Sequence, residues 1–317
     1  MKEKVKAAGL WTLIAAVMLL SACGVRTGGD NTGGSTTSTP LEVRPSAQVP
    51  MRVVTDDLGR EITIPTDITR VVSLAPSVTE NIYAVGGGDK LVGVTTFCNY
   101  PEQAKEVAKV GDTLNPNMET IIALKPDVVF VSTASQIETF TKTLEANGIA
   151  VYVTNPSTMW DAVDDLAKIA EIFGTSEIAG KRINDLHRRA TKVEWAVKGE
   201  KVFHVFVQIS KEPLFTIGKQ SFLKEVISIA GGESVTKDVE TAFPKISKET
   251  ASALNPEAII LSDSEDNKEP NEAFKNSPAV KNGRVYKINA DILSRPGPRL
   301  VDALEQIAKD LHPEKFK

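Results

Sequence analysis

Hydrophobic and polar positions alternate between two periods along most of the chain. Short runs rich in β-branched residues predict buried strands, and a helical pattern separates one strand from the next. The strands are expected at 70–74, 91–94, 127–131, 150–153, 201–207, 258–261 and 284–288. Because strands that alternate with helices form parallel sheets through right-handed crossovers, the pattern predicts two α/β lobes.

The most regular helical period lies between the two groups of strands. Apolar residues recur every three or four positions from Ala179 to Val197, which predicts an amphipathic helix of about five turns. Ser176 is the expected N-cap, and Gly199 is expected to end the helix. This helix, at 175–199, would join an N-terminal lobe (51–174) to a C-terminal lobe (200–317). A single helical connection leaves little freedom for hinge opening.

The first residues carry the pattern of a secretory leader. A lysine-rich start precedes an apolar stretch from Leu10 to Leu20, which is too short to cross a hydrocarbon core of roughly 30 Å. The sequence LSAC then ends at Cys23. This tetrapeptide resembles the lipobox of bacterial lipoproteins, which implies cleavage after residue 22 and a lipid on the Cys23 thiol. A soluble secreted protein with an Ala-type cleavage site is the alternative.

Residues 24–50 consist largely of Gly, Thr, Ser, Asn and Pro. A segment of this composition buries too little apolar surface to fold, so we expect a flexible tether. The expected organisation is a signal peptide at 1–22, a lipidated cysteine and tether at 23–50, and a folded body from residue 51. The lipid alone would hold this body at the extracytoplasmic face of the cell membrane.

Composition and charge narrow the classes of partner. The chain has 317 residues, 41% of them hydrophobic, and a formal net charge of −4, which is ordinary for a globular protein. A mildly acidic chain argues against a nucleic-acid partner. Two cysteines and three scattered histidines argue against a disulfide framework and against a metal centre built from these residues.

Four segments of the body resemble the signature sequences of one family. They are RVVSLAPSVTE (70–80), NMETIIALKPDVV (117–129), IAGGE (229–233) and RPGPRL (295–300). The family comprises the substrate-binding proteins of ABC importers for vitamin B12, ferric siderophores and haem. The segment VTTFCNYP (94–101) is most similar to the branch that binds B12-like corrinoids. The resemblance implies two α/β lobes with helix-flanked parallel sheets, one long connecting helix and a ligand cleft between the lobes.

The resemblance also implies a function. A monomer that needs no cofactor would capture cobalamin or a related corrinoid and deliver it to a membrane permease and, through it, to an ATPase. Ferric siderophores and haem are the alternative ligands. Tryptophans line the cleft of the B12-binding relative, and the matching positions here are Thr113, Ser132 and Phe243. This difference weakens the case for cobalamin in particular and leaves the importer role unchanged.

Pro76 and Ser77 are candidate ligand contacts in the first lobe. They follow the first predicted strand, at the carboxyl end where open α/β sheets bind ligands. Residues 77–80 (SVTE) are expected to form a capping box there, with backbone N–H groups open toward a ligand. The alternative is that Ser77 and Glu80 only start a helix.

Arg295 is the candidate ligand contact in the second lobe. The resemblance implies a cleft arginine whose rigid donor fork pairs with ligand oxygens, and the alternative is a surface arginine beside a Pro-rich turn. Phe97, Tyr100 and Phe243 would supply flat walls for a macrocycle, with a place in the ordinary core as the alternative for each.

Glu119 and Glu233 are candidate docking residues. Asn117 is a good N-cap, so Glu119 would lie in a first helical turn and gain from the helix dipole; Glu233 follows two glycines and could be a mere turn residue. As a pair, one on each lobe, they resemble glutamates of the B12-binding relative that meet arginines of the permease. Charges of that kind set docking register and association rate.

Other chemistry-bearing residues suggest no catalytic or metal site. Cys98 is expected to be a half-buried thiol without a role in binding, and His187, His204 and His312 are poorly placed to hold a metal in the cleft. A lipid-anchored hydrolase is the alternative from another class. The chain contains no Gly-x-Ser-x-Gly, His-Glu-x-x-His or P-loop motif, so we expect a binding protein and not an enzyme.

Overall fold

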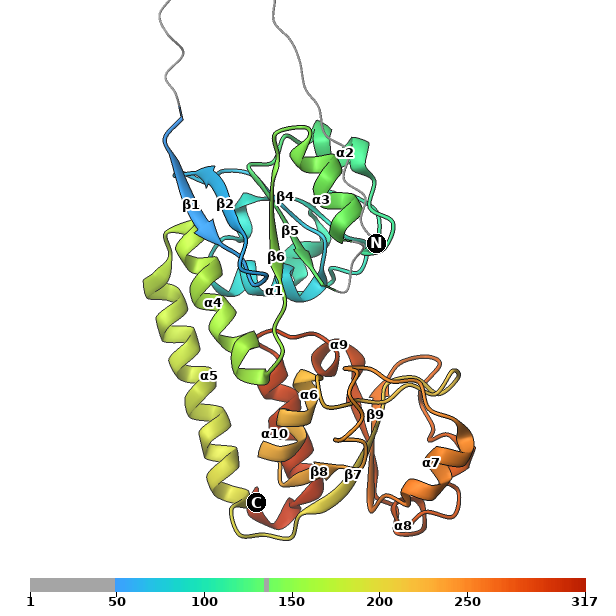
Figure 1. The fold of residues 1–317 in the computed structure, drawn as a ribbon. Coiled ribbons are helices and arrows are strands. Elements are labelled where there is room, and N and C mark those ends of the chain that lie inside the picture. The colour runs from blue at the N-terminus through green and yellow to red at the C-terminus, as the bar shows by residue number, and fades with distance from the viewer. Residues whose placement is uncertain (1–48, 134–136) are drawn as a thin grey trace, which may run out of the picture. The chain divides into compact units, whose positions relative to one another are not determined.

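The N-terminal lobe is built on a four-stranded parallel sheet in the computed structural model, which describes residues 49–133 and 137–317 (Figure 1). The strand order is β4-β3-β5-β6. The strands are β3 (Val71–Ser73), β4 (Leu91–Val94), β5 (Val128–Ser132) and β6 (Ala150–Thr154). They coincide with the four strands expected there, because each is a β-branched run buried on both faces. An antiparallel hairpin of β1 (Met51–Thr55) and β2 (Glu61–Pro65) precedes them.

Two pairs of helices cover this sheet. They are α1 (Pro76–Ala84) with α4 (Met159–Phe173), and α2 (Met118–Ala123) with α3 (Ile137–Glu145). Alternate residues of β5 point to opposite faces: Val128 and Phe130 pack in the cluster that contains α1 and α4, whereas Val129 and Val131 pack with α2 and α3. The apolar residues of β5 therefore contribute to two hydrophobic clusters, one on each face of the sheet.

The C-terminal lobe repeats the architecture with a parallel sheet in the order β10-β9-β7-β8. Its strands are β7 (Phe203–Gln208), β8 (Gly232–Ser234), β9 (Ala258–Asp263) and β10 (Val285–Asn289). Its helices are α6 (Phe222–Ile229), α7 (Lys248–Leu254), α8 (Pro278–Lys281), α9 (Ala290–Leu293) and α10 (Leu300–Leu311). Short 3-10 turns lie at Gly88–Lys90, Glu102–Lys105, Glu272–Phe274 and Pro313–Lys315. Two helix-flanked parallel sheets confirm the predicted fold class.

Helix α5 (Ser176–Val197) connects the lobes and runs alongside both of them in Figure 1. The expected N-cap is wrong by one residue, since Thr175 occupies that position without a side-chain capping bond. Gly174 ends α4 in the left-handed conformation with φ 69°, so the chain restarts at once and Ser176 is already helical. Further along α5, Arg189 donates to Asp302 and Glu305 of α10 over 2.6 and 2.7 Å.

One hydrophobic core extends through both lobes. It includes Val71 of the first sheet, Ile169 of α4, Leu186 of α5, Val205 of the second sheet and Leu304 of α10, all fully buried. Two smaller clusters lie on the opposite faces of the sheets. The connecting helix is therefore part of a shared core and not a linker between separate ones.

A buried pair of aspartates shares one lysine beside the hairpin. Nζ of Lys168 lies 2.8 Å from Oδ1 of Asp165 and 2.7 Å from Oδ1 of Asp57. Burial raises the pKa of Asp165 to about 7; the negative charge of Asp57 acts in the same direction, whereas Lys168 lowers this pKa. The Asp165 side chain is 3% exposed, and its Oδ2 has no hydrogen-bond partner among the described residues.

This arrangement predicts a pH-dependent stability. Because the pKa of Asp165 is higher in the folded state than its ordinary value of about 3.9, its stabilising contribution is full below about pH 4 and is lost as the pH rises to about 7. We therefore expect Asp165→Asn to gain stability relative to the unmodified protein as the pH rises from 4 to 8, in urea unfolding. The control is Asp67→Asn, at an exposed aspartate. A stability difference for Asp165→Asn that does not change with pH would contradict the prediction.

Candidate functional site

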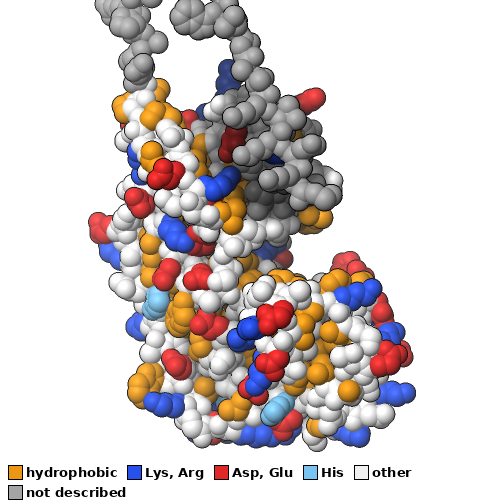
Figure 2. All heavy atoms as spheres, in the orientation of Figure 1, with side chains coloured by type: hydrophobic (Ala, Val, Ile, Leu, Met, Phe, Trp, Pro, Cys, Tyr) orange, Lys and Arg blue, Asp and Glu red, His pale blue; other side chains and the backbone are white. Residues whose placement is uncertain are grey.

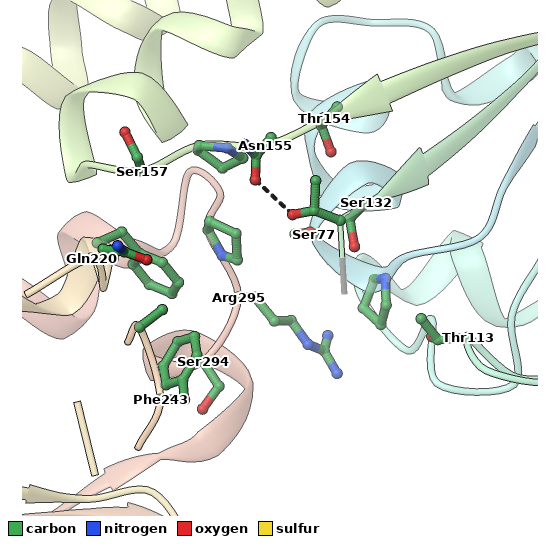
Figure 3. A pocket seen from close by; sticks show the side chains of 16 residues that line it. Ser77, Thr113, Ser132, Thr154, Asn155, Ser157, Gln220, Phe243, Ser294 and Arg295 are labelled. Carbon is green, nitrogen blue, oxygen red and sulfur yellow. Dashed lines mark hydrogen bonds between the residues drawn. The ribbon is translucent and has the colours of Figure 1, made fainter. Parts of the chain in front are cut away.

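A cavity of about 560 Å³ lies between the two lobes, where the strands of both sheets end (Figure 3). Strands β5 and β6 end at Ser132 and Thr154, which both line it, and the chain then leaves the sheet. From the other lobe, the start of α6 and the segment after α9 complete the wall. The cavity thus occupies the position at which open α/β sheets bind ligands.

Hydroxyl and amide groups form the wall on the N-terminal lobe. The polar side chains there are Ser77, Thr113, Ser132, Thr133, Thr154, Asn155 and Ser157. Thr133 Oγ1 donates to Asn155 Oδ1 over 2.6 Å, the dashed line in Figure 3. Each hydroxyl can both donate and accept a hydrogen bond, so this wall suits a ligand with many uncharged polar groups.

Two phenylalanines form an aromatic corner on the C-terminal lobe. Phe222 begins α6 after its N-cap Ser221, and its ring meets Phe243 edge to face with the centroids 6.2 Å apart. Phe222 is 6% exposed, whereas Phe243 is 43% exposed and lines the cavity. Phe243 thus offers an apolar surface opposite the polar side chains of the N-terminal lobe, held by the buried ring behind it.

Arg295 is the one charged side chain among the described lining residues, and protein groups already hold it. Its Nη1 donates to Glu80 Oε1 over 2.9 Å and to Asn99 Oδ1 over 2.7 Å. Its Nη2 donates to Asp291 Oδ1 over 2.6 Å and to the Phe97 carbonyl over 3.3 Å. The donor fork expected to meet the ligand is therefore engaged, and only Nε has no partner among the described residues.

The structure brings together four of the six candidate ligand contacts. Pro76, Ser77, Phe243 and Arg295 line the cavity. Phe97 and Tyr100 do not, which corrects the expectation of flat walls from this loop. Bonds of Asn99 to Asp291 and Arg295 hold the loop against the other lobe; the Phe97 ring is left exposed, and Tyr100 stacks under the Arg299 guanidinium at 4.1 Å.

Glu80 is the residue whose role the sequence reasoning missed. The expected capping box is absent: the N-cap of α1 is Ala75, with no side-chain capping bond. The Glu80 carboxylate instead accepts bonds from Arg295 and Arg299 of the opposite lobe. The only hint in the sequence is the pair of arginines four residues apart in the RPGPRL segment. This spacing does not indicate that both of them bind Glu80.

The two docking candidates lie on different lobes, away from the cavity lining. Glu119 is exposed in the first turn of α2, where Asn117 caps the helix by accepting from the Thr120 amide over 3.0 Å, as expected. Glu233 lies in β8, and its side chain is 42% exposed and paired with Lys237. Figure 2 shows acidic and basic side chains interspersed over this face of the C-terminal lobe. A docking partner would therefore recognise individual charged residues there and not a broad patch of one sign.

Gly231, in the same segment, is required by packing. Its φ is 83°, and a Cβ at this position would lie 2.4 Å from Nε2 of the buried His312. The glycines of the IAGGE segment therefore let the chain pass close to α10, and they place Glu233 at the edge of the sheet.

The remaining candidates have structural surroundings. Cys98 is 2% exposed, more buried than expected, and its Sγ lies 3.1 Å from the hydroxyls of Thr79 and Thr95. His187 stacks on Trp160 with ring centroids 4.6 Å apart. Among residues 49–133 and 137–317, no group of three or more His, Cys, Asp or Glu side chains could hold a metal. Cys23, the leader and the tether up to residue 48 lie outside the described residues.

Similar proteins share both the sequence and the fold. A family model for periplasmic binding proteins matches residues 71–292. The uncharacterized ABC transporter substrate-binding lipoprotein YvrC of Bacillus subtilis is 32% identical, over 98% of this chain and 99% of its own length. A vitamin B12-binding protein of Vibrio cholerae is 31% identical, over 75% of this chain and 87% of its own length.

Solved structures agree with these relatives. The periplasmic vitamin B12-binding protein BtuF of Vibrio cholerae superposes with a TM-score of 0.68 at 30% identity, covering 79% of this chain and 99% of its own. The haem-binding protein RhuT of Roseiflexus sp. RS-1 has a TM-score of 0.68 at 20% identity, covering 78% and 99%, which shows a shared fold. Among the described residues, no helix is long and apolar enough to cross a membrane. The chain therefore belongs to the periplasmic binding protein family, as a substrate-binding protein of an ABC transporter.

Proposed function

We propose that this chain is a lipid-anchored, extracytoplasmic monomer that captures a corrinoid and delivers it to a membrane permease and its ATPase. One observation carries the choice of ligand. The cavity combines a wall of uncharged hydrogen-bonding groups with an exposed aromatic ring, and the one charged side chain that the structure describes in its lining is already paired.

The chemistry of a corrinoid matches this cavity. A corrin ring is flat and apolar on its faces and carries amide groups around its edge. Phe243 can pack against the ring, while the hydroxyls of the N-terminal lobe donate to amide oxygens and accept from amide nitrogens. The Vibrio cholerae relatives that bind vitamin B12 support the same ligand class.

Haem fits the cavity less well. Proteins hold haem iron with histidine, cysteine, methionine or tyrosine, and the described lining residues include none of these. The two haem propionates would also need cations, and Arg295 is bound to Glu80 and Asp291.

A neutral ferric hydroxamate is the second candidate. It needs no axial ligand from the protein and presents uncharged oxygen atoms, which the hydroxyl wall also suits. A periplasmic solute-binding protein of Staphylococcus epidermidis, described as a possible iron-binding protein, superposes with a TM-score of 0.66 at 27% identity.

Isothermal titration of the purified mature protein with cyanocobalamin tests the ligand. We expect one-to-one binding with a Kd of about 1 nM, roughly −12 kcal/mol, as suits scavenging of a scarce nutrient. Phe243→Ala should weaken binding about 30-fold, because loss of a central aromatic contact costs about 2 kcal/mol.

The matched control is Phe97→Ala, which removes an exposed ring that does not line the cavity and should change Kd less than twofold. Binding of a ferric hydroxamate or haem, with no heat from cyanocobalamin or cobinamide, would reject the corrinoid and keep the importer role.

A further inference from the structure

A cluster of charged side chains joins the lobes beside the cavity. It consists of Glu80 and Asn99 from the N-terminal lobe, and Asp291, Arg295 and Arg299 from the C-terminal lobe; we refer to it as the inter-lobe charge cluster. Arg299 grips the Glu80 carboxylate with two parallel bonds, Nε to Oε2 at 2.8 Å and Nη2 to Oε1 at 2.6 Å. Arg295 adds a third bond to Glu80 Oε1 at 2.9 Å.

Three members of the cluster, Glu80 and the two arginines, are largely withdrawn from water. The exposed fractions of the side chains are 2% for Glu80, 12% for Arg295 and 16% for Arg299. Charge interactions are stronger in such surroundings than at the surface, and a buried charge that loses its partner is costly. Glu80 therefore offsets the positive charge of Arg295 much more effectively than an exposed carboxylate would.

The cluster contains two guanidinium groups and two carboxylates, so its formal charge is zero. Arg295 is the member that faces the cavity, as Figure 3 shows, and both carboxylates of the cluster contact it. Four of its five N–H donors are directed to protein acceptors. A ligand in the cavity therefore meets a neutralised arginine with one N–H left to donate.

We infer that Glu80 is a specificity-determining residue, which makes the cleft accept an uncharged, amide-bearing ligand and reject the same ligand carrying a carboxylate. A ligand carboxylate near Arg295 would have to displace Glu80 or Asp291, or remain desolvated beside both. An amide makes no such demand, because the hydroxyl wall satisfies it. The inference rests on the proposed corrinoid function and adds the charge of the ligand to it.

A purely structural role for Glu80 predicts a different result. If Glu80 only held the lobes together, its loss would weaken an amide ligand and the corresponding acid by the same factor. A role in specificity changes the ratio of the two affinities. The ratio is therefore the decisive measurement, and it is insensitive to a general loss of affinity.

The experiment titrates the full mature chain at pH 7.5 with cyanocobalamin and, separately, with each of its monocarboxylic acids, in which one peripheral propionamide is hydrolysed. The unmodified protein should bind cyanocobalamin at least tenfold more tightly than one or more of these acids. Glu80→Gln keeps the size of the side chain and removes its charge, and it should bring that ratio close to one or invert it. Glu102→Gln, at an exposed glutamate that pairs with Lys105 outside the cluster, should keep the original ratio.

Asp291→Asn is the second variant, in case Glu80→Gln does not fold. Its carboxylate also contacts Arg295 but is 37% exposed, so the ratio should shift in the same direction by a smaller factor. An unchanged ratio in a folded Glu80→Gln protein, or equal affinities in the unmodified protein, would overturn the inference and leave the corrinoid function intact. No binding of any corrinoid by the unmodified protein would overturn both.

Discussion

Cells that carry Glu119→Arg together with Glu233→Arg are expected to lose ligand uptake, while the isolated variant keeps its affinity for the ligand. Both glutamates have exposed side chains, lie on different lobes and are absent from the cavity lining. If each faces an arginine of the permease, reversal places like charges together at a cost of several kcal/mol. The measurement combines uptake of labelled cyanocobalamin by cells with titration of the purified variant.

A charge-matched control separates docking from a general effect of charge. Glu102→Arg with Glu177→Arg produces the same change in net charge at two exposed glutamates, whose side chains are 81% and 85% exposed. This control should transport normally. Normal uptake by the Glu119/Glu233 double variant would remove both residues from the docking surface.

Replacing Cys23 with alanine is expected to abolish lipidation, and either to move nearly all of the protein out of the membrane fraction or to stall its processing. The proposed anchor is the lipid on this thiol, and a lipid chain contributes about 0.8 kcal/mol for each CH₂ group that it buries. No membrane-spanning helix is present in residues 49–133 and 137–317. Cell fractionation and mass spectrometry of the N-terminus measure the distribution and the modification.

Cys98→Ala is the control for this experiment, because Cys98 is buried inside the N-terminal lobe and should not affect partitioning. A Cys23→Ala protein that is still processed and still partitions as a lipoprotein would show that the LSAC segment is not the anchoring site.

Local patterns were enough to place most of the fold. The runs that form β3, β4, β5 and β6 are mostly apolar and rich in valine, which is typical of strands buried on both faces. Strand β8 was missed because Gly232-Glu233-Ser234 has neither period nor β-branched residues, and it is a strand only through pairing with β7.

The interactions within the site depend on residues far apart in the chain. Ser77 and Glu80 have the spacing of a capping box, yet Glu80 contacts arginines 215 and 219 positions away. No local pattern reports such a partner. The segment 94–101 is a second case in which a local pattern was not enough. Its composition does not tell which side chains turn toward the cavity, and neither Phe97 nor Tyr100 lines it.

The core that runs through both sheets has a consequence for how the molecule folds. Ile169 of α4, Leu186 of α5 and Leu304 of α10 belong to one packed interior, so neither sheet can lose its helices without exposing the apolar surface of the other half. Two lobes with separate sheets would ordinarily be counted as two folding units. Here they should melt in a single cooperative transition, because the cleft separates the lobes only at the surface and both lobes share one hydrophobic core.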